Sequence, residues 1–212
     1  MDEYDEDLAV YFARPALEQV LDHIAAAMQD VRDLPEFACD GSWLEESVLT
    51  IPAFIGCRTA FFMGVRTVAE FFVRMPRGDY TARTYLPNWT PRPALAKRLD
   101  VVWLGASKHI AHMSLERVPA SAEAYQPWDC SLRALRAIGR DCWKILDEFA
   151  TAYSERGGTY ASEFREMAAG TRPPALSEYR AWQREKREIF GAAAHPIRFR
   201  AAAHAVDGDG HR

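Results

Sequence analysis

The stretch that decides the fold is residues 54–73, which read FIGCRTAFFMGVRTVAEFFV. Its apolar residues recur every three or four positions, as on one stripe of an α-helix: Phe54, Cys57, Phe61, Val65, Val68 and Phe72. Ile55, Phe62 and Val73 lie beside this stripe and widen it. Because a surface helix buries only a narrow stripe, this width predicts a central helix that neighbours contact on several sides.

Helical spacing of apolar residues recurs on both sides of this stretch, and no segment alternates in the manner of a β-strand. A short helix from Ser42 is expected to end or kink at Pro52. We expect longer helices at about 15–34, 93–117 and 129–154, and weaker, more polar ones at about 160–169 and 176–190. The sequence therefore predicts an all-α fold, an up-and-down helical bundle.

The chain divides into four expected segments. Residues 1–14 form an acidic mobile stub, 15–156 form the bundle, 157–190 hold peripheral helices, and 191–212 form an Ala-rich disordered tail. Within the bundle, the stretch 77–93 is rich in proline and aromatic residues. That composition predicts an ordered loop pinned by its rings.

Composition limits the class of function. The 212 residues carry a net charge of −4, so any site for anions must be local. The apolar run 48–65 is interrupted by Pro52 and Arg58 and is too short to span a bilayer, and the acidic first residues do not resemble a secretion signal. The four cysteines form no C-x-x-C pair. We therefore expect a cytoplasmic protein with reduced thiols and no membrane partner.

One flank of the predicted helix 93–117 gathers residues that can do acid–base chemistry. His112 and Glu116 are one turn apart, so the carboxylate can orient the imidazole, and Lys108 lies one turn before His112. Metal-free cleavage of a phosphodiester requires a histidine that moves the proton of the 2′-hydroxyl and a cation that stabilises the phosphate. His112 and Lys108 are thus the candidate catalytic residues. The alternative is a histidine bonded to a neighbouring helix and a solvated lysine.

The same flank permits a metal site. His109 and His112 are three residues apart, and Glu116 would supply a third ligand. The chain has neither an H-E-x-x-H motif nor a second matching cluster, so we expect no metal and no cofactor.

A basic stripe is predicted on the helix 129–154. Its cations are spaced by three, four and four residues, and they are Arg133, Arg136, Arg140 and Lys144. Such a stripe can hold a phosphate backbone, with Trp143 available for stacking on a base. The other interpretation is a solvated helix face whose cations pair with Asp141, Asp147 and Glu148.

A second charged pattern, Arg66, Glu70 and Arg74, has the i,i+4 spacing of an ion-pair ladder. We expect a structural role for Arg66 and Glu70, as for Glu116. Since Arg66 and Glu70 lie in an otherwise apolar helix, they need a polar partner, for which the helix that carries His112 is a candidate.

Three segments in order carry a family resemblance: RTVAEFF at 66–72, DYTARTYLPNW at 79–89 and SKHIAHMSLER at 107–117. Over residues 45–120, the chain resembles uncharacterised bacterial helical proteins of the HEPN superfamily, near its abortive-infection-linked branches. The family's hallmark is an arginine followed, after four to six residues, by a histidine. The resemblance places His112 at that histidine, whereas the arginine's positions hold Gly105, Ala106 and Ser107, and Lys108 is the nearest cation.

The resemblance implies a helical bundle that dimerises and binds RNA or a nucleotide, as many HEPN proteins are metal-independent ribonucleases of toxin or antiviral systems. His109 would then join the basic stripe in holding the nucleic acid. Without the arginine, the expected activity is a degenerate or partner-assisted endoribonuclease in phage defence or a toxin–antitoxin setting. The alternative is a non-enzymatic dimeric interaction module, such as an immunity or antitoxin component.

Overall fold

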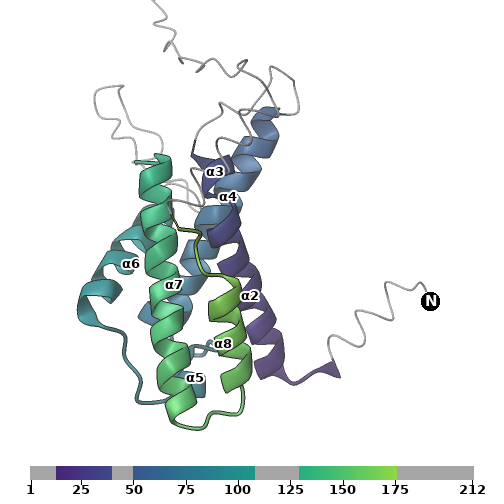
Figure 1. Cartoon of the computed structure of the whole chain (residues 1–212), viewed down its shortest axis with the longest axis vertical. Coiled ribbons are helices and arrows are strands. Elements are labelled where there is room, and N and C mark those ends of the chain that lie inside the picture. The colour runs from purple at the N-terminus through teal and green to yellow at the C-terminus, as the bar shows by residue number, and fades with distance from the viewer. Residues whose placement is uncertain (1–12, 40–49, 108–128, 176–212) are drawn as a thin grey trace, which may run out of the picture.

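The structure, a computed structural model, describes residues 13–39, 50–107 and 129–175, the side chains of 50–53 excepted, and every regular element there is helical (Figure 1). The predicted all-α fold is confirmed. The elements in chain order are α2 (Ala16–Asp33), α3 (Pro35–Ala38), α4 (Thr50–Ala69), the π-helical turn η1 (Glu70–Arg74), α5 (Ala82–Tyr85), α6 (Pro93–Ala106), α7 (Leu132–Glu155) and α8 (Ala161–Gly170).

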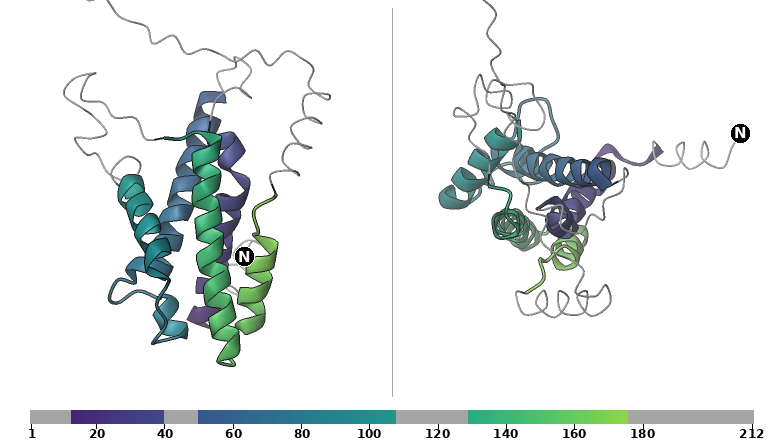
Figure 2. Two further views of the ribbon diagram at one scale, coloured as in Figure 1. Left: turned by 60° about the vertical axis from the view of Figure 1, so that its left-hand side comes forward. Right: turned by 90° about the horizontal axis from the view of Figure 1, so that it is seen from above.

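Successive long helices run in opposite directions, so the bundle is an up-and-down one. In Figure 1, α2 rises, α4 descends, α6 rises, α7 descends and α8 rises again, and Figure 2 shows these helices side by side from two further directions. The prediction of a central helix is confirmed, because α4 contacts α2, α3, α6 and α7. No helix within the described ranges combines the length and the apolar character needed to cross a membrane.

Both ends of α7 carry residues that satisfy its terminal backbone groups. At its start, the Ser131 side chain accepts from a first-turn amide at 3.3 Å, and the Ser131 amide donates to the Asp129 carboxylate at 2.9 Å. That hydrogen bond lowers the pKa of Asp129. At its end, Gly157 has a φ of 66°, and the Gly158 amide donates to the Tyr153 carbonyl at 3.1 Å. The predicted stop at these two glycines is confirmed.

The core is built largely from phenylalanine rings. Five of them are fully buried and come from four different elements: Phe61, Phe62, Phe72, Phe149 and Phe164. Phe149 of α7 is a meeting point, with ring centroids 5.4 Å from Phe72 of η1 and 4.8 Å from Phe164 of α8. Tilted and edge-on ring pairs such as these add stabilisation beyond the area that they bury.

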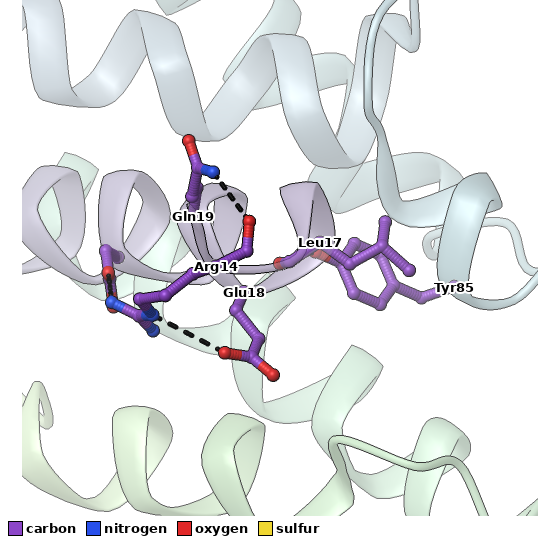
Figure 3. A network of polar contacts seen from close by, with 6 residues as sticks. Arg14, Leu17, Glu18, Gln19 and Tyr85 are labelled. Atoms are coloured by element: carbon purple, nitrogen blue, oxygen red, sulfur yellow. Dashed lines mark hydrogen bonds and ion pairs between the residues drawn. The ribbon is translucent and has the colours of Figure 1, made fainter. Parts of the chain in front are cut away.

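Aromatic rings pin the loop 77–93, as predicted, because Tyr85 and Trp89 are both buried. The loop also contains the short helix α5, which ends at Tyr85. The Tyr85 hydroxyl donates to the Leu17 carbonyl of α2 at 2.7 Å (Figure 3), and its ring meets Phe164 of α8 edge-on at 5.2 Å. Burial raises the pKa of Tyr85, so this hydroxyl stays a donor.

Two glycines allow α2 to lie close to its neighbours. A Cβ on Gly64 of α4 would sit 2.8 Å from the Ala27 carbonyl oxygen, and one on Gly139 of α7 would sit 3.2 Å from the Val31 carbonyl oxygen. Ala27 and Val31 are one turn apart on α2. The backbones of α4 and α7 therefore approach the same face of α2 at a distance that a larger residue would prevent.

The last turn of the central helix is wider than an α-helix, which the sequence did not predict. In η1, the Met75 amide donates to the Glu70 carbonyl five residues back, at 2.9 Å, and Met75 then takes a φ of 46°. This turn holds Phe71 and Phe72 with 3% and 0% of their surface exposed, although they are adjacent in sequence. A π-helical turn absorbs one extra residue in this way.

Other boundaries differ from the prediction. α4 begins at Thr50 and continues through Pro52, because the amide that proline lacks has no partner in a first turn. α6 is described to Ala106, and Ser107 keeps a helical backbone. Residues 108–117 of the predicted helix 93–117 lie outside the described residues, as do 42–49 of the helix expected from Ser42, the expected helix at 176–190, and residues 1–12 and 191–212. α8 belongs to the range expected to be peripheral, yet its Phe164 is fully buried.

Candidate nucleic-acid interface

The basic stripe of α7 contains three exposed cations and one that pairs with a carboxylate. Arg133, Arg140 and Lys144 are exposed. Arg136 instead points toward α3, where its guanidinium donates to the Glu36 carboxylate, with Nε at 3.0 Å, and both side chains are largely buried. The predicted stripe is therefore present on the surface as three cations, and Arg136 holds α7 to α3.

Two acidic residues of α7 pair with arginines outside the stripe. Asp141 accepts two hydrogen bonds from Arg98 of α6, at 2.7 and 2.9 Å, a pairing that raises the pKa of Arg98. Glu148 accepts from the backbone amide of Arg92 at 2.9 Å and from its guanidinium at 2.5 Å. The interpretation that these two carboxylates pair with the stripe is wrong, because they pair with Arg98 and Arg92, which lie outside α7. Asp147 is exposed.

The indole of Trp143 is partly buried against α8. Its Nε1 donates to the Ala168 carbonyl of α8 at 2.8 Å, and the guanidinium of Arg172 lies 5.6 Å from the ring centroid. The stacking role stays a prediction, and the contact with α8 limits the part of the ring that a base can reach. The same packing brings Arg172, which is exposed, to the edge of the stripe. Nothing in the local sequence signals this position.

We refer to Arg133, Arg140, Lys144 and Arg172 as the cationic face. Across the described part of the chain, none of these four side chains has an acidic partner. Solvated cations that have no carboxylate to displace are the ones that phosphate oxygens contact at least cost.

A small hollow adjoins the cationic face. It has a volume of about 30 Å³ and lies between the junction of α2 with α3, the middle of α7 and the prolines after α8, and its walls include Arg32, Arg136 and Arg140. Arg32 donates to Asp33 at 2.5 Å and to the Gly170 carbonyl. Because Arg32 and Arg136 already have carboxylate partners, Arg140 is the arginine of this hollow that an anion meets first.

The second charged pattern has a structural role between α4 and α6. Arg66 donates to the Glu70 carboxylate at 2.9 Å, and the Trp103 indole donates to the same oxygen at 3.0 Å. Arg74 leaves the predicted ladder: it donates to Asp100 at 2.5 Å and lies 3.7 Å from the Trp103 ring centroid. The π-helical turn separates Arg74 from Glu70. The predicted polar partner on the next long helix is Trp103 of α6.

The candidate catalytic residues His112 and Lys108 lie outside the described residues, as do His109 and Glu116. The residue before them, Ser107, is buried, and its hydroxyl has no hydrogen-bond partner among the described residues. Among the residues with described positions, no three histidine, cysteine or acidic side chains are grouped to hold a metal ion.

Comparison of the chain with protein-family models, curated proteins and solved structures finds no match.

Proposed function

We propose that this chain is a HEPN-like helical protein that binds RNA or a nucleotide through the cationic face of α7. The observation that carries the proposal is the pairing of Asp141 with Arg98 and of Glu148 with Arg92. Since these two carboxylates of α7 are paired with Arg98 and Arg92, they do not pair with Arg133, Arg140 and Lys144, which can contact a polyanion although the chain as a whole is acidic.

The expected mode of binding is contact with phosphates. Each phosphate that a lysine or arginine neutralises releases a counterion, and the affinity then falls with salt at a slope of about 0.7 per contact for a single strand. Because the Trp143 indole is bonded to α8 and partly buried, we expect base stacking on it to contribute less than the phosphate contacts. Binding should therefore depend strongly on salt and weakly on base sequence.

In the catalytic part of the proposal, His112 acts as the general base or acid toward the 2′-hydroxyl of RNA. Lys108, or an arginine of a second chain, stabilises the scissile phosphate, and His109 helps to hold the strand. The proposed enzyme is thus a metal-independent, partner-assisted endoribonuclease that works as a homodimer in the cytoplasm, in phage defence or a toxin–antitoxin pair.

A second candidate, a non-enzymatic dimeric module of the immunity or antitoxin type, is favoured by a different observation. Val101 and Leu104 of α6 are 63% and 47% exposed, and Ile55 and Met63 of α4 are 56% and 41% exposed. α4 and α6 are in contact along the bundle. Large apolar side chains on neighbouring helices are a common basis for association between chains.

The test measures binding of a short fluorescein-labelled single-stranded RNA by anisotropy. In one variant, Arg133, Arg140 and Lys144 are replaced with alanine. The control replaces Arg77, Arg83 and Lys97, two arginines and a lysine that are also exposed but lie outside the cationic face, so both variants lose the same charge. We expect the first variant to bind at least tenfold more weakly at about 50 mM salt, with a salt slope lower by roughly two, and the control to bind nearly as the parent does.

Equal loss in the two variants would remove the cationic face from the proposal, because net charge alone would then explain binding. Absence of RNA binding by the parent would leave the interaction module. Cleavage is measured separately with His112→Ala, which should bind RNA and fail to cut it. Cleavage that persists in this variant excludes His112 as the catalyst.

A further inference from the structure

A second hollow, distinct from the cationic face, lies where α2 meets the end of the central helix. Its volume is about 180 Å³. Its walls come from α2, from the junction of α4 with η1, and from the turn that follows, and they comprise Val20, His23, Ile24, Thr67, Glu70, Phe71, Pro76, Asp79, Tyr80 and Thr81. We call it the α2–η1 cleft. This volume is below the roughly 300–1,000 Å³ of most ligand sites, so it limits a ligand to a small molecule.

Local structure fixes the shape of this cleft. The left-handed conformation of Met75 turns the chain away from η1 and sends residues 76–81 along its open side. Thr81 then starts α5 with a capping box in which its amide donates to the Thr84 hydroxyl at 3.0 Å. Since Thr81 is buried and bonded on this side, Asp79 and Tyr80 are held at the rim by a short connection.

The cleft is apolar at its base and acidic at its rim. Ile24 and Phe71, with 3% exposure each, form the base. Glu70, Asp79 and His23 line it, and no lysine or arginine of the described chain does. One oxygen of Glu70 already accepts from Arg66 and Trp103, whereas Asp79 is exposed and has no ion pair with any described residue.

An aromatic ring completes this set of groups. Tyr80 is 51% exposed and lines the cleft next to Asp79, so a ligand can reach part of its side chain. A carboxylate beside an exposed aromatic ring favours a cation, because the ring's quadrupole and the negative charge attract the same ligand group. The molecule uses this chemistry nearby, where Arg74 lies over Trp103 with its partner Asp100.

We propose that the α2–η1 cleft binds a small organic cation, an ammonium group attached to an apolar body about the size of one ring. The apolar body occupies the base against Ile24 and Phe71. The ammonium group lies between the Asp79 carboxylate and the Tyr80 ring, with the second oxygen of Glu70 as a further acceptor. The inference does not depend on RNA binding, which concerns a different face of the bundle.

The experiment compares two probes of nearly equal shape, phenethylammonium and the neutral 2-phenylethanol, by isothermal titration calorimetry on the full chain. We expect the cation to bind at least tenfold more tightly than the alcohol, the ratio that one charge-assisted hydrogen bond supplies. Asp79→Asn and Tyr80→Ala should each weaken the cation by about fivefold or more and leave the alcohol nearly unchanged. Asp147→Asn removes an equally exposed carboxylate from α7 and is the matched control.

Equal binding of the two probes, or binding of neither, overturns the proposal. So does an Asp79→Asn variant that binds the cation as well as Asp147→Asn does. Circular dichroism melting curves accompany each titration, because both rim side chains are exposed and their replacement should leave the fold intact. If Tyr80→Ala melts early, Tyr80→Leu replaces it, since leucine keeps an apolar surface and lacks the ring quadrupole.

Discussion

The close contact between α2 and α4 predicts that two glycines of α4 respond differently to replacement by alanine. Gly56 and Gly64 both lie in α4, so replacement by alanine gives each the same gain in helix propensity. A Cβ on Gly56 meets nothing within 4 Å, whereas a Cβ on Gly64 meets the Ala27 carbonyl oxygen at 2.8 Å and a methyl of Val31 at 3.2 Å. The pair therefore separates propensity from packing within one element.

The expected magnitudes have opposite signs. Alanine in place of an exposed helical glycine stabilises by about 0.5–1 kcal/mol, and this is the expected result for Gly56→Ala. At Gly64 the same gain is opposed by an overlap with backbone, which no side-chain rotation relieves, and overpacking of this kind costs about 1–3 kcal/mol. We expect Gly64→Ala to be less stable than the parent by roughly 0.5–2 kcal/mol.

Urea unfolding followed by circular dichroism measures both variants against the parent, with the slope m as a check that the transition stays two-state. The two variants should differ from each other by about 1–3 kcal/mol, well above the error of the method. If Gly64→Ala proves as stable as Gly56→Ala, the helices are not held at the distance that the structure gives, and the reasoning is refuted.

Three further outcomes follow from single side chains. Tyr85→Phe should destabilise the chain by about 0.5–1.5 kcal/mol, because the Leu17 carbonyl loses its donor, and an unchanged urea midpoint would contradict this. Burial first, and Asp33 second, raise the pKa of Asp30, so its charged form is disfavoured in the folded state and stability falls as pH rises through that raised pKa. Asp30→Asn should therefore unfold at higher urea than the parent at neutral pH, and the difference should vanish in acid below the ordinary carboxyl range. Burial raises the pKa of Cys142, so iodoacetamide should modify it only upon unfolding, and mass spectrometry that finds it modified as fast as Cys130 would exclude a closed core.

Much of the fold is predictable from the sequence because the apolar spacing is strong. The width of the stripe in 54–73 predicts the central position of α4, and the pair Gly157 and Gly158 predicts the end of α7. The π-helical turn is not predictable in this way. Its extra residue arises because Phe71 and Phe72 both find partners in the assembled core, and spacing within one helix contains no information about those partners.

The candidate site is less predictable for the same reason. Spacing along the helix predicts that Asp141 pairs with cations one turn away. In the structure Arg98, which is distant in sequence, donates to this carboxylate because α6 lies beside α7. The same holds for Trp143, whose role depends on α8. The spacing along the sequence predicts which cations lie on α7. Only tertiary packing decides which of them have carboxylate partners and which are exposed to a ligand.

The position of Tyr85 has a consequence for how the bundle opens. Through its hydroxyl and its ring, this one residue links Leu17 at the start of α2 with Phe164 of α8, which are far apart in the chain. α2 and α8 cannot fray at that end without breaking the contacts of Tyr85, so their backbone amides should exchange with deuterium together and only in the global transition. Two helices far apart in the chain are thereby made one cooperative unit.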